Sequence, residues 1–304
     1  MLRSSLRVFL ACLAFALSAK GQDTTRLIFL SDTQTPMWAE KIYLSSDDNE
    51  AATQNIFSSI LNEKDITAVV HAGDLTGLGW LRSSWKPILP FIDSLKTRSI
   101  PFLAAKGNHD YYFIHLWAMD RFEEYIPNGK SDYSLHRFDS CTVIILNSNE
   151  EKMTEDLRTA QRRWYDSTLA ACDADSAVRW VFTVAHHSPF TNSDMVTGSK
   201  FIRNEYLSAF YTSVKSKVWI GGHAHRFEHF NRNGKDFLVV GGGGGLHHGK
   251  RTEHPHDDLH TGDGRFFHYL RCTVFSDSLL MEAISITADS HQAKTAYCIS
   301  IPRH

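Results

Sequence analysis

The chain has 304 residues, of which 42% are hydrophobic and 22% are charged, so it can bury the core of an ordinary globular protein. Its formal net charge of −2 excludes proteins that bind nucleic acid or anionic lipid through an overall positive charge, and no local nucleic-acid-binding surface is evident. Any anion that the chain binds must therefore be held by a few local side chains.

Residues 1–21 have the features of a secretory signal peptide. Arg3 and Arg7 give a positive start, and residues 8–17 form an apolar segment that is too short to span a bilayer. A small-x-small pattern follows, and we expect cleavage before Gln22. The sequence therefore predicts a secreted or periplasmic protein that has no membrane span once the signal peptide is removed.

The N-terminus has two less favoured interpretations. A membrane anchor would need a longer apolar run. A lipoprotein attached through Cys12 is disfavoured by the bulky Phe9-Leu10 pair that precedes this cysteine.

Residues 22–304 contain no internal repeat, charge block or linker rich in Pro and Ser, so we expect a single domain. Within it, five apolar or β-branched runs alternate with segments of helical spacing, such as residues 50–63 and 154–171. Such alternation predicts βα units, in which ligands collect beyond the carboxyl ends of the strands. The five predicted strands comprise residues 26–30, 67–70, 100–105, 180–185 and 218–220.

Each of these strands is followed by polar residues that can bind a metal ion or move a proton. Asn108 offers a neutral carbonyl oxygen, and His109 can hold or release a proton near neutral pH. His223 and His225 are one residue apart on an extended segment, so they point to the same side and can serve two neighbouring metal ions. The five fragments are Asp32-Thr33-Gln34, Gly73-Asp74, Gly107-Asn108-His109-Asp110, His186-His187-Ser188-Pro189 and Gly222-His223-Ala224-His225.

Any one of these fragments could instead be a capped turn or an exposed loop. Their recurrence at successive strand ends favours one shared site. Other histidines are given no catalytic role: His136 is expected to be a strand residue. The polar, histidine-rich residues 247–263 are expected to form an exposed mobile loop, although they could line a substrate entrance or bind an extra metal ion.

The end of the chain is expected to be antiparallel β-structure. Residues 266–275, 279–286 and 296–301 show the alternation of half-buried strands, and we expect them to close the second sheet of the domain.

Four cysteines remain after the signal peptide, namely Cys141, Cys172, Cys272 and Cys298. Three pairings are possible in an exported protein. A disulfide between Cys272 and Cys298 is a reasonable guess because both lie in consecutive predicted strands. The alternative is that all four thiols are reduced and buried.

Taken in order, the five polar fragments resemble the signatures of calcineurin-like metallophosphoesterases. Residues Gln161–Trp164, the turn at Ser188-Pro189 and the glycine run Gly241–Gly245 resemble the purple acid phosphatase branch in particular. The resemblance implies an α/β metallophosphoesterase fold, which is a four-layer α/β/β/α sandwich of two mixed β-sheets flanked by helices. Two metal ions would lie between the sheets.

Two positions depart from the family pattern. Gln34 stands where many members have histidine, and this Asp-x-Gln form resembles branches that hydrolyse nucleoside diphosphate-linked compounds. Gly77 stands where purple acid phosphatases have a metal-binding tyrosine, so a purple iron site is not expected.

The resemblance also implies a set of metal ligands. His187 is preferred over His186 because it occupies the family position before Ser188-Pro189, which leaves His186 as a supporting or rim residue. Nitrogen and oxygen donors of this kind suit two divalent or trivalent ions of Fe, Mn or Zn. The first ion would be held by Asp32, Gln34, Asp74 and His225, and the second by Asp74, Asn108, His187 and His223.

A mechanism follows from this resemblance. A hydroxide that bridges the two metal ions would attack phosphorus in line with the leaving oxygen. His109 would act as the general acid that protonates the leaving oxygen, and Asp110 would orient or charge its imidazole. The alternative for His109 is a structural hydrogen bond beneath the site.

The sequence thus predicts a secreted, dimetal-dependent phosphoesterase whose substrate is a phosphorylated small molecule, with phosphomonoesters preferred. One alternative is a hydrolase of phosphodiesters or nucleotide pyrophosphates. Another is a catalytically silent metal-binding or partner-binding protein, which is disfavoured because every expected ligand position except Gln34 holds a standard donor.

Overall fold

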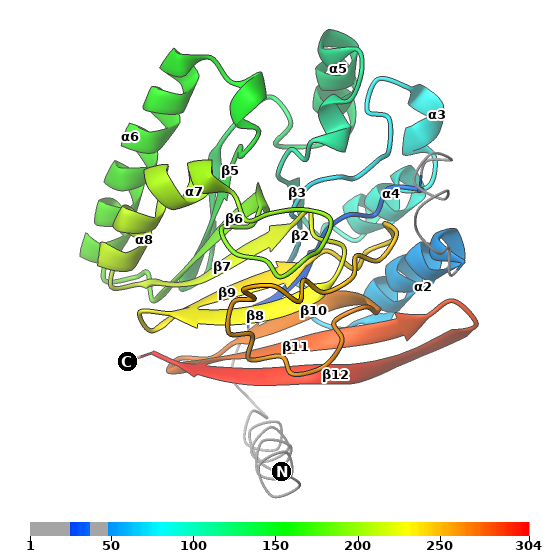
Figure 1. The fold of residues 1–304 in the computed structure, drawn as a ribbon. Helices are drawn as coiled ribbons and strands as arrows, with labels where there is room; N and C mark the ends of the chain where they lie inside the picture. Colours follow the sequence, from blue (N-terminus) through cyan, green and yellow to red (C-terminus); the bar gives the residue numbers. More distant parts are fainter. Residues whose placement is uncertain (1–24, 37–47, 304) are drawn as a thin grey trace, which may run out of the picture.

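The computed structural model describes residues 25–36 and 48–303, so the predicted signal peptide and its cleavage site lie outside the described residues. Two six-stranded sheets occupy the centre of the molecule (Figure 1). In the described part of the chain, no helix combines the length and the apolar character that crossing a membrane requires.

The first sheet contains strands from the beginning and the end of the described chain, in the order β12-β11-β10-β1-β2-β3. β1, β2 and β3 are parallel, whereas β10, β11 and β12 are antiparallel to their neighbours. The strands are β1 Thr25–Leu30, β2 Ala68–His71, β3 Phe102–Ala104, β10 Phe267–Val274, β11 Ser278–Thr287 and β12 Ser290–Pro302.

The last three strands are antiparallel as predicted, but the prediction that they close the second sheet is wrong. β10 pairs with the edge of β1 that β2 leaves free, with Leu27 opposite Cys272. All three strands therefore extend the first sheet. Alternation in the sequence indicates a half-buried strand but does not choose between two available sheet edges.

The second sheet has a parallel centre and antiparallel edges, in the order β4-β5-β6-β7-β9-β8. His136 lies in β4, as predicted, with its Nε2 2.9 Å from Ser134 Oγ. The strands are β4 Ser134–Phe138, β5 Cys141–Leu146, β6 Trp180–His187, β7 Ser216–Gly222, β8 Phe227–Arg232 and β9 Lys235–Val240.

Helices cover the outer face of each sheet (Figure 1). The longest, α6, begins after Thr154, whose side chain accepts a hydrogen bond from Leu157 N at 3.2 Å, as its sequence predicts. Beside the first sheet lie α2 Asn49–Asn62, α3 Arg82–Trp85, α4 Leu89–Thr97 and α5 His115–Tyr125. Beside the second sheet lie α6 Glu155–Ala174, α7 Lys200–Glu205 and α8 Leu207–Thr212.

Three apolar layers hold these elements together. Leu27 and Phe29 of β1 pack between the two sheets, where the Phe29 ring lies 5.6 Å from that of Phe182. Ile28 and Leu30 point to the opposite face and pack beneath α2, and a third apolar cluster lies between the second sheet and its helices. Burying each side chain of this size contributes about 1.5–3 kcal/mol to the stability of the folded state. The predicted four-layer α/β/β/α sandwich is therefore confirmed.

The proposed disulfide between Cys272 and Cys298 is wrong, because Cys272 is a free, buried thiol, as are Cys141 and Cys172. β11 lies between the strands that carry the two cysteines: Cys272 pairs with Met281, and Glu282 pairs with Cys298. Two strand spacings amount to about 9–10 Å, which is too far for a disulfide. Burial raises the pKa of the Cys272 thiol well above its usual value.

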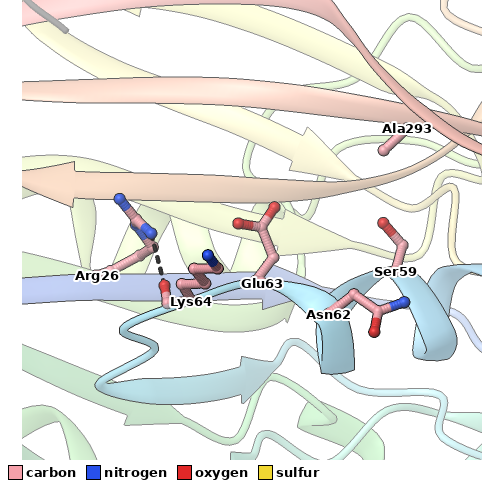
Figure 2. A pocket seen from close by; sticks show the side chains of 6 residues that line it. All are labelled: Arg26, Ser59, Asn62, Glu63, Lys64 and Ala293. Carbon is pink, nitrogen blue, oxygen red and sulfur yellow. Dashed lines mark hydrogen bonds between the residues drawn. The ribbon is translucent and has the colours of Figure 1, made fainter. Parts of the chain in front are cut away.

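A surface pocket of about 430 Å³ lies at the amino end of β1 (Figure 2). Arg26 near the start of β1 contributes to it, whereas Asp32 follows the other end of that strand. The pocket is therefore remote from the carboxyl ends of the parallel strands. Its lining residues are Arg26, Ser59, Asn62, Glu63, Lys64 and Ala293.

His268 in β10 makes the stability of the protein depend on pH. It is fully buried beside Phe227 and Phe266, and its Nδ1 donates a hydrogen bond to Phe266 O at 2.8 Å. Burial lowers the pKa of His268 to about 3. In the unfolded chain a histidine titrates at about pH 6.5, so stability is lost progressively as the pH falls from there toward 3.

We expect the substitution His268→Gln to reduce this acid sensitivity. Between pH 7 and pH 5, the free energy of unfolding of the wild type should fall by about 2 kcal/mol more than that of the variant. Denaturant unfolding at both pH values measures the difference, and His254→Gln, at an exposed histidine, is the matched control. The same pH dependence in the wild type and His268→Gln would contradict the prediction.

Candidate metal centre

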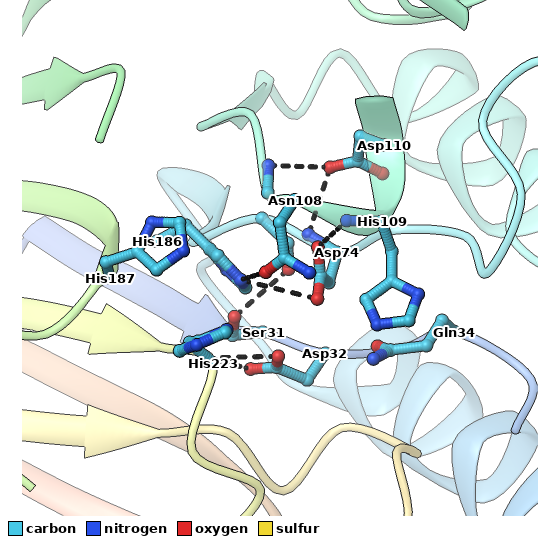
Figure 3. Close-up of polar contacts among 12 residues, drawn as sticks. Ser31, Asp32, Gln34, Asp74, Asn108, His109, Asp110, His186, His187 and His223 are labelled. Atoms are coloured by element: carbon cyan, nitrogen blue, oxygen red, sulfur yellow. Dashed lines mark hydrogen bonds and ion pairs between the residues drawn. The ribbon is translucent and has the colours of Figure 1, made fainter. Parts of the chain in front are cut away.

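Five strand ends from both sheets meet at one edge of the molecule. β1, β2 and β3 are parallel in the first sheet, as are β6 and β7 in the second, so the residues that follow them lie on the same side. Figure 3 shows that side chains from these strand ends point toward one another. The structure therefore brings together the five sequence fragments that were expected to share a site.

An unusual backbone conformation turns three of these side chains into the site. Asp32, Asp74 and His223 have φ angles of 59°, 58° and 67°, in the left-handed region that few residues other than glycine adopt. Such strain costs on the order of 1–3 kcal/mol per residue and is concentrated at functional sites. Asp32 N donates to Gly73 O and Thr33 N donates to Asp74 O, both at 3.0 Å, so the first two loops hold each other in place.

Two glycines allow the backbone to approach the carboxylates. A Cβ atom at Gly107 would lie 2.1 Å from Asp74 Oδ1, and one at Gly222 would lie 2.4 Å from Asp32 Oδ2. Both distances are far below van der Waals contact. Any larger residue at either position would therefore displace a carboxylate.

Asp74 lies at the centre of the site and is buried. Its Oδ1 accepts a hydrogen bond from His109 N at 2.8 Å, whereas its Oδ2 has no hydrogen-bond partner among the described residues and lies 3.3 Å from His186 Nε2. Burial acts to raise the pKa of Asp74, but His186, His109 and His223 together outweigh it and hold that pKa well below its usual range. A buried, ionised carboxylate that has an oxygen free of hydrogen bonds and faces a cationic imidazole is suited to a metal cation.

His186 contacts the two oxygen donors on either side of it. Its Nε2 lies 3.0 Å from Asn108 Oδ1 and 3.3 Å from Asp74 Oδ2, and its Nδ1 lies 3.0 Å from Ala72 O. Burial acts to lower the pKa of His186, but Asp74 raises it to about 9. A proton on Nε2 and a metal ion would thus compete for the same oxygens.

His187 and His223 complete a cluster of three imidazoles. The His223 ring centroid lies 4.4 Å from that of His187 and 5.1 Å from that of His186. Burial and the neighbouring His186 lower the pKa of His187 to about 3, and burial with the other two rings lowers the pKa of His223 well below its usual value. Both are therefore neutral at pH 7, which is the form that binds metal.

Two groups of these residues have donor atoms close enough to hold a metal ion, since all donors in a group lie within 4.8 Å of one another. His186 is a member of both groups, although the sequence favoured His187 as the ligand. The groups are Asp32, Asp74 and His186, and His186, His187 and His223.

Gln34 and His225 lie on the other side of Asp32. His225 Nε2 is 3.5 Å from Asp32 Oδ1 and 3.2 Å from the side-chain amide of Gln34, and its Nδ1 lies 2.8 Å from Leu246 O. In the amide orientation that satisfies its neighbours, the Gln34 side chain donates to the backbone oxygens of Asp32 and Asp74 and accepts from His225. The structure thus brings His225 to the carboxylate of Asp32, and it brings Gln34 to His225 and to the backbone of the Asp32 and Asp74 loops.

The expected contact between Asp110 and the His109 ring is replaced by a different arrangement. Asp110 Oδ2 accepts hydrogen bonds from Asp74 N at 3.0 Å and Gly107 N at 2.8 Å, and its Oδ1 accepts one from Leu75 N at 3.0 Å. Burial raises the pKa of Asp110 to about 8. The carboxyl group of Asp110 therefore fixes the loops around Asp74 and is not oriented toward the imidazole of His109.

The His109 ring is positioned by other groups. Its Nδ1 lies 3.4 Å from Gly77 O, and its ring stacks on Tyr112 with centroids 5.3 Å apart. Gly77 is the residue that stands where a tyrosine was expected from the resemblance. Its backbone oxygen thus contacts the predicted general acid.

Sequence reasoning missed two residues that support the histidines. Ser148 Oγ accepts a hydrogen bond from His187 N and lies 2.9 Å from His187 Nδ1. His248 stacks on His225 with centroids 4.3 Å apart, and its Nδ1 accepts from His225 N. Ser148 follows the apolar strand β5, so the rule that revealed the other fragments could have found it. His248 carried no comparable signal, because its contact with His225 arises only in the folded chain.

The glycine run at residues 241–245 packs against the loop after β1. Gly243 N donates to Ser31 O at 3.0 Å, and Gly245 N donates to Asp32 O at 2.9 Å. These two backbone hydrogen bonds hold the Asp32 loop in addition to the one that Asp32 N donates to Gly73 O.

Residues 25–227 match the family model described as calcineurin-like phosphoesterase. Purple acid phosphatase 22 of Arabidopsis thaliana is 21% identical over 184 residues, and the match covers 57% of this chain and 41% of that protein. The chain therefore spans less than half the length of this relative.

Two solved structures have a similar fold. GAP50, described as the anchor in the inner membrane complex of Plasmodium, has a TM-score of 0.72 at 14% identity, covering 92% of this chain and 89% of that chain. The purple acid phosphatase PPD1 from yellow lupin (Lupinus luteus) seeds has a TM-score of 0.67 at 16% identity, covering 92% of this chain and 54% of that chain. At such identities the similarity shows the fold alone.

Metal binding should displace the proton of His186. Because the pKa of this group is raised to about 9, it is protonated at pH 7, and a ligating imidazole must be neutral. We expect Zn²⁺ to release about one proton more from the wild type than from His186→Asn at pH 7, and this difference to vanish near pH 10. Calorimetric titration in two buffers of different ionisation enthalpy counts the protons.

The matched control is His187→Asn. Burial lowers the pKa of His187 to about 3, so this residue is already neutral and its loss should leave the proton count unchanged. If the wild type and His186→Asn release the same number of protons, His186 is not the group from which the metal displaces a proton.

Proposed function

Because the chain belongs to the calcineurin-like phosphoesterase family, we propose that it is a dimetal-dependent hydrolase of phosphate esters. The observation that carries this proposal is the buried carboxylate of Asp74. Its Oδ2 has no hydrogen-bond partner among the described residues, and it faces His186 from the other sheet. A shared carboxylate at this position would reduce the repulsion between two neighbouring cations.

The donors support two overlapping metal positions. We propose His186 in place of His187 as a ligand, because His186 Nε2 contacts both Asn108 and Asp74. The mixture of carboxylate, amide and imidazole donors suits Fe, Mn or Zn. One ion would be held by Asp32, Gln34, Asp74 and His225, and the other by Asp74, Asn108, His186 and His223.

The bound ions would supply a nucleophile from water at neutral pH and stabilise the charge on the phosphoryl oxygens. The protein would supply the proton for the leaving oxygen through His109. The contact of Nδ1 with Gly77 O leaves Nε2 for this transfer, and the bond from His109 N to Asp74 Oδ1 fixes the loop that carries the ring. Asp110 would act through the backbone of these loops as a positioning residue.

Phosphomonoesters are the proposed substrates. A second candidate, hydrolysis of phosphodiesters or nucleotide pyrophosphates, is favoured by Gln34, which stands where many family members have histidine. Comparing the rates on a nitrophenyl phosphate and on the corresponding diester separates the two. Residues 1–21 support the further proposal that the protein is secreted or periplasmic.

We expect His109→Asn to lower kcat by about 10²–10⁴-fold while leaving bound metal largely unchanged, because asparagine keeps the backbone bond to Asp74 but cannot act as an acid. The loss should be larger for an alkyl phosphate than for nitrophenyl phosphate, whose leaving oxygen needs little protonation. Steady-state kinetics on both substrates, with metal analysis of the same samples, provide the measurement.

The matched control is His136→Asn in β4, which should retain wild-type kinetics. Unchanged turnover in His109→Asn, or an equal loss on both esters, would remove His109 from the proposed role. If chelated protein to which Fe, Mn or Zn is added back hydrolyses neither the monoester nor the diester, the proposed function itself is wrong and a silent binding role is favoured.

A further inference from the structure

An exposed apolar segment lies directly after the loop that carries His109. Nine large hydrophobic side chains are exposed in the described part of the chain, and five of them fall within residues 112–117. Phe113 is 75% exposed, so it forgoes the roughly 1.5–3 kcal/mol that burial of such a side chain would contribute. The five are Tyr112, Phe113, Ile114, Leu116 and Trp117.

Two of these residues connect the segment to the site, and we call Tyr112 and Phe113 the aromatic rim. The Tyr112 ring stacks on His109, with centroids 5.3 Å apart and planes inclined by 12°. Phe113 meets the Tyr112 ring edge-on, with centroids 4.9 Å apart and planes inclined by 72°. Tyr112 N donates to His109 O at 3.1 Å, so the turn that carries His109 also folds the rim back onto it.

The backbone of the rim is strained as well. Phe113 has a φ angle of 63°, which for a bulky residue costs on the order of 1–3 kcal/mol. This strain is not offset by packing, because most of the ring is exposed to solvent. Strain and exposure coincide in a residue two rings away from the proposed proton donor, which indicates that the rim serves binding and not folding.

We infer that the aromatic rim binds the leaving group of the substrate, so that phosphate esters of aromatic alcohols, with the ring close to the ester oxygen, are the preferred substrates. This inference rests on the proposed function, in which the leaving oxygen faces His109. In an in-line displacement the leaving group points away from the nucleophile. A ring on that oxygen therefore lies beyond His109, beside Tyr112 and Phe113.

The geometry of the rim suits such a ring. Aromatic pairs prefer offset-stacked or edge-to-face arrangements with centroids 4.5–7 Å apart, and the rim offers both a ring face and a ring edge. An aliphatic leaving group would gain less, since it lacks a flat surface to stack. The rim would thus select among esters without touching the phosphoryl group.

The substitution Phe113→Asn tests this inference. It removes the ring and introduces a residue type that tolerates a positive φ angle, so the loop should keep its shape. Val214→Ala is the matched control, because Val214 is 67% exposed and precedes β7, at the end opposite His223. Two readouts are compared in the protein supplied with Mn²⁺: binding of benzylphosphonate against ethylphosphonate by calorimetry, and kcat/KM for phenyl phosphate against glycerol 2-phosphate.

We expect Phe113→Asn to lower the aromatic-to-aliphatic ratio about five- to tenfold in both readouts, with the kinetic change mainly in KM. Val214→Ala should leave both ratios within about twofold of the wild type. Unchanged ratios in Phe113→Asn would overturn the inference. If this variant instead changes the oligomeric state in size-exclusion chromatography with both ratios unchanged, the rim is an interface between copies of the chain and the inference is wrong.

The binding readout separates this inference from the proposed function. A wild type that binds benzylphosphonate selectively through Phe113 but hydrolyses neither ester supports the rim and contradicts the hydrolase. A wild type that hydrolyses both esters, with ratios that do not depend on Phe113, keeps the hydrolase and overturns the rim.

Discussion

The buried carboxylate of Asp74 is the group on which the whole site depends. It carries a negative charge away from water, and one of its oxygens has no hydrogen-bond partner among the described residues. Such a charge is costly unless a cation faces it. His186 faces it with a raised pKa, and the same position would suit a metal ion. The contacts around Asp74 hold this carboxylate where the two sheets meet.

Holding it there requires strain that the rest of the fold must offset. Three residues after strand ends have positive φ angles, and Gly107 leaves no room for a side chain beside Asp74. Asp110 counteracts this strain by accepting three backbone hydrogen bonds from the loops around Asp74. The apolar layers on both faces of each sheet supply the stability that makes the strained loops possible. The site is therefore built on strand ends whose loops are joined by backbone hydrogen bonds.

Much of the fold and of the candidate site could be predicted from the sequence. Apolar runs identify strands, and the polar residues that follow them identify the edge of the sheets where the site lies. Asp32, Asp74, Asn108 and His223 were expected in one site, and they lie there. What could not be predicted depends on contacts between distant segments. Alternation did not reveal that β10 joins the free edge of β1, which separates Cys272 from Cys298 by one strand. The role of Asp110 was missed because its partners are backbone amides, which have no sequence signature. The choice between His186 and His187 likewise depends on which ring turns toward Asp74.

In the proposed site, Asp74 shares its carboxylate between two metal ions. Crystals grown with Mn²⁺, measured near the manganese absorption edge, test this claim directly. We expect two anomalous peaks about 3.5–4 Å apart, each within coordination distance of an Asp74 carboxylate oxygen. Peaks that lie elsewhere, or a single peak that does not touch Asp74, would contradict it.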